Sequence, residues 1–114
     1  MTLQGECTVG NDQNKVSKSI EFWERCRQVI PAGSSTLAKS PARLAYRFSP
    51  FYAQCASGRH FWDIDGNEWL DCEMSMGTVV WGHCRAEVDA AMLAQIQKGV
   101  HFSIPSTLEF ELAE

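Results

Sequence analysis

The sequence has no run of basic residues and no long apolar stretch. Its 10 Lys and Arg stand against 14 Asp and Glu, which gives a formal net charge of −4. Nothing here attracts a nucleic-acid backbone or an anionic membrane surface, so neither partner is expected. A bilayer span needs about 20 apolar residues, and the first 15 residues also lack the apolar segment of a secretory signal. We therefore expect a cytoplasmic protein.

Cysteine motifs are also missing. The five cysteines have wide, irregular spacings and include no C-x-x-C pair. This pattern argues against a disulfide framework and against a zinc site. Reduced, mostly buried thiols are expected instead.

The spacing of the residues also argues against a calcium-binding loop. The segment Asp63–Asn67 alternates carboxylate and amide oxygens, which Ca²⁺ prefers as ligands. An EF-hand loop starting at Asp63 would need Gly at its sixth position and Glu at its twelfth, but Gly66 is fourth and Met74 is twelfth. The turn chemistry of Asp65-Gly66-Asn67 explains these residues without a metal ion.

What is present is a moderately apolar chain of 114 residues with 45% hydrophobic and 21% charged residues, which fits at most one soluble domain. Residues 1–16 show no periodicity and are predicted to be a flexible leader. An amphipathic helix is predicted over Ser17 to Ile30, and Pro31 ends its pattern. Its apolar stripe consists of Ile20, Trp23, Cys26, Val29 and Ile30.

An α+β arrangement follows from the rest of the pattern. Residues 32–50 are rich in Ser, Ala and Pro and predict an irregular connection. Residues 51–72 alternate apolar and polar positions around Gly58 and the Asp65–Asn67 turn, which predicts a small antiparallel β-meander. A second amphipathic helix is predicted from Val88, Ala91, Met92 and Ile96, ending near Gly99.

A third helix is predicted to begin at the capping box Ser106-x-x-Glu109. Each side chain of this pair can satisfy the backbone N–H of the other, and Pro105 and Phe110 can form the accompanying apolar staple. The sequence ends at Glu114 about two turns later without a C-cap signal. We therefore expect this helix to be truncated.

Two features with possible chemistry remain open. Ser75-Met76-Gly77 and Gly82-His83 form a glycine-punctuated stretch, which either brings backbone close to a ligand or only permits a tight bend. His83 and Cys84 are adjacent, but a nucleophile and its base are normally assembled from distant parts of a chain, so a core or loop placement is favoured. His60 and His101 indicate no special role.

The segment from Gly58 to Asp71 contains a W-D-x-D-G-N turn and an aromatic-φ-D strand, and Ser75-Met76-Gly77 and Gly82-His83 follow it as an S-x-G…G-H loop. The chain thereby resembles the N-terminal segment of class III aminotransferases, nearest to the glutamate-1-semialdehyde 2,1-aminomutase type. Val29 to Ser35 is similar to the V-I-P-G-G-V-x-S entry of that group, and Pro105 to Glu114 to its P-T-x-L-E-x-E-L-A-E helix start.

The resemblance implies the fold of a fold-type-I transferase and, in the full-length parent, a homodimer with pyridoxal 5'-phosphate and small-molecule amino donor and acceptor substrates. It places residues 17–114 in the small domain and implies that the large cofactor-binding domain is absent. None of the four lysines stands in the context of the family's Schiff-base lysine. We therefore expect no catalytic, cofactor-binding or metal residue here and an inactive fragment. Ser35 and Met76 are the positions carried over as substrate-facing.

Four departures from the family pattern bear on the substrate. Ala32 replaces the first of two glycines, Met76 stands where the aminomutase type has Trp, Thr78 where it has Pro, and Arg85-Ala86 where it has His-Pro. The missing Trp matters most, because that ring shapes the substrate pocket in the family. An ordinary transaminase of the same branch therefore fits the sequence as well as an aminomutase does.

The alternative hypothesis is a stand-alone binding module without catalysis that binds a partner through exposed aromatics, namely Trp62, Trp69 and Trp81. The two hypotheses predict different burial. A self-sufficient module buries Trp23, Val88, Met92 and Phe110 internally, whereas a fragment leaves apolar patches of several hundred Å² uncovered.

Overall fold

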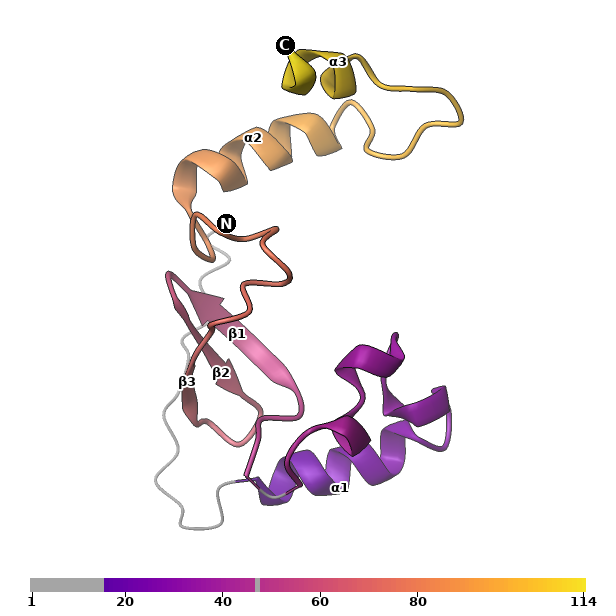
Figure 1. The fold of residues 1–114 in the computed structure, drawn as a ribbon, viewed down its shortest axis with the longest axis vertical. Helices are drawn as coiled ribbons and strands as arrows, with labels where there is room; N and C mark the ends of the chain where they lie inside the picture. Colours follow the sequence, from indigo (N-terminus) through magenta and orange to yellow (C-terminus); the bar gives the residue numbers. More distant parts are fainter. Residues whose placement is uncertain (1–15, 47) are drawn as a thin grey trace. The chain divides into compact units, whose positions relative to one another are not determined.

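The computed structural model describes residues 16–46 and 48–114 and divides into two compact units, one up to His83 and one from Cys84 to Glu114 (Figure 1). The predicted leader, residues 1–16, lies outside the described part of the chain except for Val16, which is buried. Within the described ranges, no helix is both long and apolar enough to cross a membrane.

The first helix, α1, runs from Ser17 to Cys26 and is shorter than the predicted Ser17–Ile30. The chain continues after Cys26 in tight turns, and Ile30 is extended with φ −124° and ψ 121°. Pro31 accounts for the extended Ile30, because the ring of a proline disfavours helical backbone at the residue before it. The apolar stripe is therefore split: Trp23 is half-buried, whereas Val29 is 80% exposed.

The predicted irregular connection contains three short 3₁₀ turns, η1 (Pro31–Gly33), η2 (Leu37–Lys39) and η3 (Pro41–Arg43). The turn η1 contacts both α1 and η3. The buried Ser40 hydroxyl donates to the Ala32 carbonyl oxygen at 2.9 Å and thereby links the start of η3 to η1. A stretch without regular periodicity is thus folded by local turns and a buried side-chain hydrogen bond.

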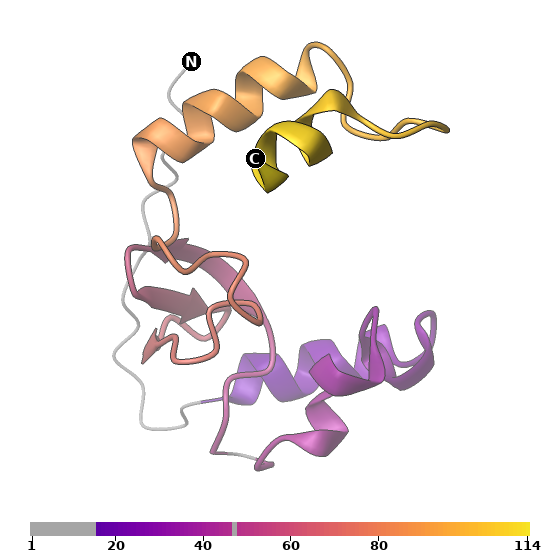
Figure 2. The ribbon, with the colours of Figure 1, turned by 45° about the horizontal axis from the view of Figure 1, so that its top comes forward.

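The predicted antiparallel meander is confirmed: β1 (Ala53–Ser57), β2 (His60–Asp63) and β3 (Glu68–Leu70) form one sheet in that order (Figure 2). Gly58 has φ +55° in the first turn and Gly66 has φ +86° in the second. These left-handed conformations favour Gly, because in any other residue the Cβ comes too close to the following carbonyl oxygen of the backbone.

The packing between α1 and the two residues that precede β1, Phe51 and Tyr52, is aromatic. Phe22 meets Tyr52 edge to face at a centroid distance of 4.9 Å, and Trp23 meets Phe51 in the same way at 5.9 Å. The buried hydrophobic side chains in the described part of this unit are Val16, 4% exposed, and Phe51, 8% exposed, and Pro41 is also buried. The apolar core of this unit is therefore small, and aromatic contacts supply much of its packing.

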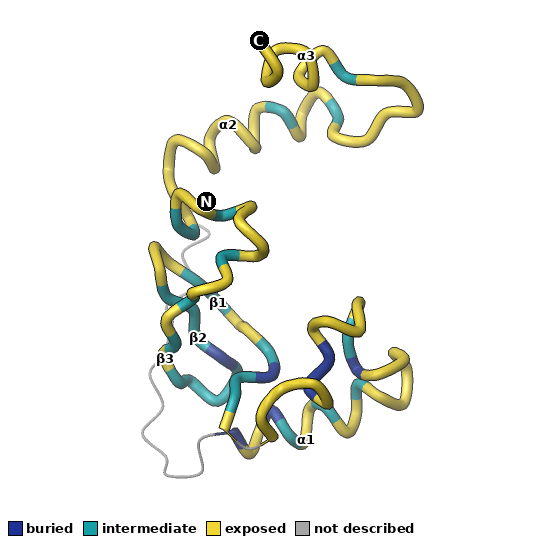
Figure 3. Tube along the Cα trace, viewed as in Figure 1, coloured by how far each residue is buried: buried dark blue, intermediate teal, exposed yellow. Residues whose placement is uncertain are grey.

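The second unit contains α2 (Ala86–Ile96) and α3 (Thr107–Ala113). The predicted capping box is confirmed: Ser106 accepts from the Leu108 N–H, and the Glu109 carboxylate accepts from the Ser106 N–H at 3.0 Å. This unit has no buried residue (Figure 3). Its apolar side chains are exposed, for example Met92 at 58% and Phe110 at 66%.

The cysteines differ in part from the expectation. Cys26, Cys72 and Cys84 are not disulfide-bonded; Cys26 lies at an intermediate depth, whereas Cys72 and Cys84 are exposed rather than buried. Cys55, in β1, is disulfide-bonded, so the prediction of reduced thiols is wrong at this position. The spacing of the cysteines does not predict this disulfide, because two bonded cysteines need to be close in space and not in the sequence.

Candidate functional site

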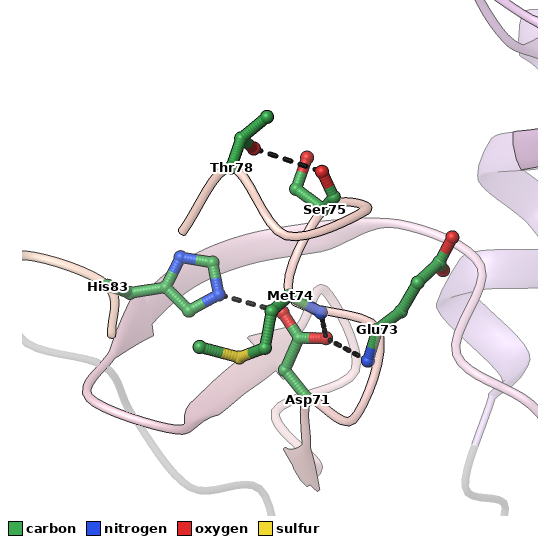
Figure 4. Close-up of polar contacts among 6 residues, drawn as sticks. All are labelled: Asp71, Glu73, Met74, Ser75, Thr78 and His83. Atoms are coloured by element: carbon green, nitrogen blue, oxygen red, sulfur yellow. Dashed lines mark hydrogen bonds and ion pairs between the residues drawn. The ribbon is translucent and has the colours of Figure 1, made fainter. Parts of the chain in front are cut away.

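The loop between β3 and the second unit, residues 71–83, is closed by one side-chain pair (Figure 4). The Asp71 Oδ2 atom lies 2.8 Å from the His83 Nε2 atom, and the two residues are 12 positions apart. Both side chains are largely shielded, with exposed fractions of 15% for Asp71 and 21% for His83. We call this pair the Asp71–His83 clasp.

Backbone hydrogen bonds anchor both ends of the loop to the turn between β1 and β2. The Asp71 N–H donates to the Arg59 carbonyl oxygen at 2.8 Å. Gly58 and His83 exchange two backbone hydrogen bonds, at 3.0 Å and 2.8 Å, in an isolated antiparallel bridge. A Cβ at Gly82 would approach the Gly58 carbonyl oxygen to 3.2 Å. Gly82 therefore permits this close approach of the two backbones.

Asp71 also fixes the start of the turn that follows it. Its Oδ1 atom accepts from the Glu73 N–H at 3.1 Å and from the Met74 N–H at 2.8 Å (Figure 4). One carboxylate thus bonds two amides with one oxygen and the imidazole with the other. An Asp side chain that bonds the backbone two or three residues later is a typical turn-former.

The turn itself is left-handed. Met74, Ser75 and Met76 have φ values of 50°, 51° and 59°, and Gly77 follows at 91°. The left-handed conformation costs a non-glycine residue about 1–2 kcal/mol. Such strain persists where the surrounding contacts over-determine the backbone, and it gathers at functional sites. Internal hydrogen bonds support the turn, including the Thr78 hydroxyl to the Ser75 carbonyl oxygen at 3.0 Å.

The electrostatics of the clasp favour the ionised form of Asp71. The hydrogen bond from His83 lowers the pKa of Asp71 below its ordinary value of 3.8, and the Met74 N–H lowers this pKa further, against an opposing effect of burial. A carboxylate that accepts several hydrogen bonds is stabilised in its charged form. Asp71 therefore holds the loop as a carboxylate at neutral pH.

Met76, predicted to face the substrate, lies in the middle of the left-handed turn with 86% of its side chain exposed. Ser35, the other predicted residue, is exposed in the bend between η1 and η2. No hydrogen bond or ion pair among the described residues joins Ser35 to Met76. The structure places each of them at an accessible position of the chain, on different loops.

The segment before Ser35 is held by close packing around Gly33. The Tyr52 hydroxyl donates to the Gly33 carbonyl oxygen at 2.8 Å. A Cβ at Gly33 would lie 2.5 Å from Cδ1 of the Trp23 ring. Burial, together with a hydrogen bond to the Cys26 side chain, raises the pKa of Tyr52 to about 12. The hydroxyl is therefore neutral and able to donate at neutral pH.

The Asp63–Asn67 turn is confirmed as a hairpin turn. Asp63 is fully buried, and its carboxylate accepts from the backbone N–H groups of Asp65 and Asn67, from the Asn67 side-chain amide and from the Trp69 indole. The carboxylate oxygens are thus occupied by donors. No cluster of three or more potential metal ligands occurs among residues 16–46 and 48–114.

The Asp71–His83 clasp was missed by sequence reasoning, although both residues belong to the pattern of the family resemblance. His83 is adjacent to Cys84 and belongs to the Gly82-His83 stretch, and neither feature points to Asp71 as its partner. An Asp followed by a turn is a common local signal, but nothing in the spacing indicates that an imidazole 12 positions later completes it.

Comparison with known proteins supports the resemblance. No family model matches the sequence. The chain is 37% identical over 106 residues to the glutamate-1-semialdehyde 2,1-aminomutase of Methanothrix thermoacetophila, and 32% identical over 111 residues to that of Saccharolobus islandicus. These matches cover 93% and 97% of this chain but only 24% of each relative. An omega-transaminase from Sphaerobacter thermophilus has the same fold over 82% of this chain and 20% of its own, with a TM-score of 0.66 and 29% identity.

The chain matches the N-terminal segment of a class III aminotransferase. Two further solved structures resemble this aminotransferase segment. A transaminase with pyridoxal phosphate bound gives a TM-score of 0.63 at 31% identity, over 82% of this chain and 21% of its own. A glutamate-1-semialdehyde aminomutase from Pseudomonas aeruginosa gives 0.63 at 18% identity, over 83% and 20%, and shows the shared fold alone. The chain spans about a quarter of the length of the curated relatives it matches.

Proposed function

We propose that this chain is the N-terminal, small-domain part of a pyridoxal-phosphate-dependent aminotransferase or aminomutase that acts on an amino acid, an amino aldehyde or an amine. The observation that carries the proposal is the match over more than nine tenths of the chain to aminomutases about four times as long. The proposed parent enzyme is a cytoplasmic homodimer with residues 17–114 in its small domain.

The burial of the described residues supports a part of a larger enzyme over a stand-alone module. Val88 is 41% exposed, Met92 58% and Phe110 66%, so these residues are not buried internally as a self-sufficient module requires. Trp62 and Trp69 are half-buried, and Trp81 at 73% is the exposed member of the three proposed partner-binding aromatics. Large uncovered apolar surfaces mark places where another surface docks.

The cofactor would be held by the remainder of the enzyme. The described lysines are Lys18 in α1, Lys39 in η2 and Lys98 just after α2, and none of them lies on the 71–83 loop. We propose that none of these lysines forms the Schiff base with pyridoxal phosphate. The bound cofactor would supply an electron sink for the carbanion left when a substrate Cα–H bond breaks. We propose that this chain by itself is inactive.

The contribution of this chain would be to the substrate side of the active site. Ser35 offers a hydroxyl that can donate to or accept from a polar substrate group, and Met76 offers a flexible, polarisable apolar side chain. Both are exposed in this structure and therefore accessible to a substrate or to the rest of the enzyme. We assign them as substrate-facing residues of the parent enzyme.

A graft tests the proposal. The matching segment of the Methanothrix thermoacetophila aminomutase is replaced by this chain, and the product is assayed for cofactor absorbance, amino-group transfer and aminomutase activity. The expected result is a cofactor-binding protein that transfers amino groups. The 114-residue chain alone is the control and is expected to bind no cofactor and transfer no amino group. A folded, cofactor-loaded graft without any transfer would count against the proposal.

The same graft separates an aminomutase from an ordinary transaminase. The substitution Met76→Trp restores the residue usual in the aminomutase type. If Met76 marks a transaminase, this substitution raises the ratio of aminomutase to transaminase activity. Ser35→Ala is the companion variant and is expected to raise KM for the amino substrate while the cofactor absorbance stays unchanged. An unchanged KM would remove Ser35 from the substrate side.

A further inference from the structure

We propose that Asp71 and His83 are positioning residues that hold the Met74–Gly77 turn in its left-handed form and thereby aim the Met76 side chain at the amino substrate. The inference rests on the proposed function for the role of Met76. The positioning itself rests on contacts of the described residues and concerns a pair that takes no direct part in the chemistry.

Hydrogen bonds connect the Asp71–His83 clasp to the Met74–Gly77 turn. The Asp71 Oδ1 atom bonds the N–H groups of Glu73 and Met74, and the Glu73 carbonyl oxygen accepts from the Met76 N–H at 3.0 Å. A short relay of hydrogen bonds therefore links the carboxylate to the backbone of Met76. Movement of the carboxylate would release the amides that begin the turn.

His83 fixes the position of the Asp71 carboxylate. The imidazole Nε2 atom lies 2.8 Å from the Asp71 Oδ2 atom (Figure 4). The His83 backbone is held by its two hydrogen bonds to Gly58. His83 is thus anchored to the turn between β1 and β2, and its imidazole orients the carboxylate that shapes the Met74–Gly77 turn. Hydrogen bonds between an ionised carboxylate and an imidazole are directional and stronger than neutral ones.

The Met74–Gly77 turn needs such a constraint. Three successive non-glycine residues, Met74, Ser75 and Met76, have positive φ, a conformation that such residues rarely adopt unaided. Met76 is 86% exposed, so its own packing does not hold it there. The direction of its side chain is set by the backbone of the turn, and hence by the clasp.

His83→Phe tests the positioning, because it keeps a ring of similar size and removes the hydrogen-bonding nitrogen. His83→Gln is the conservative variant, since its amide can donate to Asp71. His60→Phe is the matched control: His60 faces Glu68 at 3.6 Å on the same sheet but lies outside the 71–83 loop. Asp71→Ala removes the other half of the pair and decides the question should His83→Phe lose its fold.

The first readout is the sign of φ at Met74, Ser75 and Met76 in the 114-residue chain, taken from nuclear magnetic resonance couplings between the amide and Hα protons together with the intraresidue amide–Hα nuclear Overhauser effect, which is stronger at positive φ. The positive φ values are expected to disappear in His83→Phe and Asp71→Ala and to persist in His83→Gln and His60→Phe. Positive φ values that persist in folded His83→Phe or Asp71→Ala would overturn the proposal.

The second readout is a double-mutant cycle in the active graft. His83→Phe and Met76→Ala are each expected to raise KM for the amino substrate by about tenfold, with cofactor absorbance unchanged, and the double variant is expected to match Met76→Ala alone, because coupled residues give non-additive effects. Multiplying effects would overturn the positioning role. An inactive unsubstituted graft would count against the proposed function instead, while the φ readout still decides whether the clasp holds the turn.

Discussion

Asp65, in the turn between β2 and β3, caps α1 through Ser19, which lies 46 positions earlier in the chain. One carboxylate oxygen accepts from the Ser19 N–H at 3.0 Å, and the other accepts from the Lys18 N–H at 2.7 Å. The local N-cap residue, Val16, offers no side-chain acceptor. The hairpin turn therefore supplies a cap that the helix sequence lacks, and it joins α1 to the sheet.

Replacing this cap should destabilise the protein measurably. Asp65→Ala is expected to lower the free energy of unfolding by about 1–2 kcal/mol, the usual effect of losing an N-cap. Asp65→Asn should have a smaller effect, because it keeps an acceptor and loses only the attraction between the carboxylate and the helix dipole. Urea unfolding followed by tryptophan fluorescence measures both. Glu21→Ala, at an exposed site of α1, is the control and should change the value by less than about 0.5 kcal/mol. Equal stabilities of Asp65→Ala and the control would refute the capping role.

The substitutions Ala32→Gly and Gly33→Ala, at adjacent positions, should change the stability of the protein in opposite directions. Ala32 has φ +59°, where the family pattern has Gly, so Ala32→Gly relieves a strained backbone and should stabilise by about 0.5–1 kcal/mol. Gly33→Ala should destabilise by about 2 kcal/mol or more, since φ is +70° and the new Cβ would lie 2.5 Å from Trp23. Thermal unfolding of the two variants compares them directly. A shift of Tm in the same direction for both variants would contradict this account of the turn.

Tyr52 should make the fold sensitive to alkali. Its pKa is raised from 10.0 to about 12 in the folded protein. A raised folded pKa gives stability that is fully present below pH 10 and is lost as the pH rises through about 12. Tyrosinate absorbance should therefore show a late-titrating group that is missing in Tyr52→Phe. This variant should also lose about 1 kcal/mol at neutral pH, because Gly33 loses its donor. A late-titrating group that survives in Tyr52→Phe would assign the shift to another residue.

Asp71 should contribute to acid sensitivity. Its folded pKa lies below the ordinary value of 3.8, mainly because of the His83 hydrogen bond. A depressed folded pKa gives stability that is present above about pH 4 and is lost as the pH falls through the folded value. Titration of the Asp71 carboxyl carbon by nuclear magnetic resonance measures this pKa, which should rise toward its ordinary value in His83→Phe. An unchanged pKa in that variant would show that the backbone amides alone cause the shift.

Local patterns predicted the elements that depend on near neighbours. The capping box of Ser106 and Glu109 and the hairpin at Asp65-Gly66-Asn67 both appeared as predicted, because each is stabilised by contacts between residues a few positions apart. The helix end was misplaced because the apolar stripe continues to Ile30, whereas α1 ends at Cys26 and the chain continues in turns to the extended Ile30 before Pro31. The roles of Ser35 and Met76 stay predictions, since an exposed position does not reveal what it faces.

The sequence by itself determined the element types, their order and the family resemblance, because these follow from periodicity, turn residues and short motifs. Only the tertiary structure decided which distant groups meet. Asp65 caps α1, and Asp71 and His83 close the loop that carries Met76. These partners lie 46 and 12 positions apart. The reason is physical: a carboxylate binds any donor that the folded backbone brings within about 3 Å, and that proximity is a property of the fold as a whole.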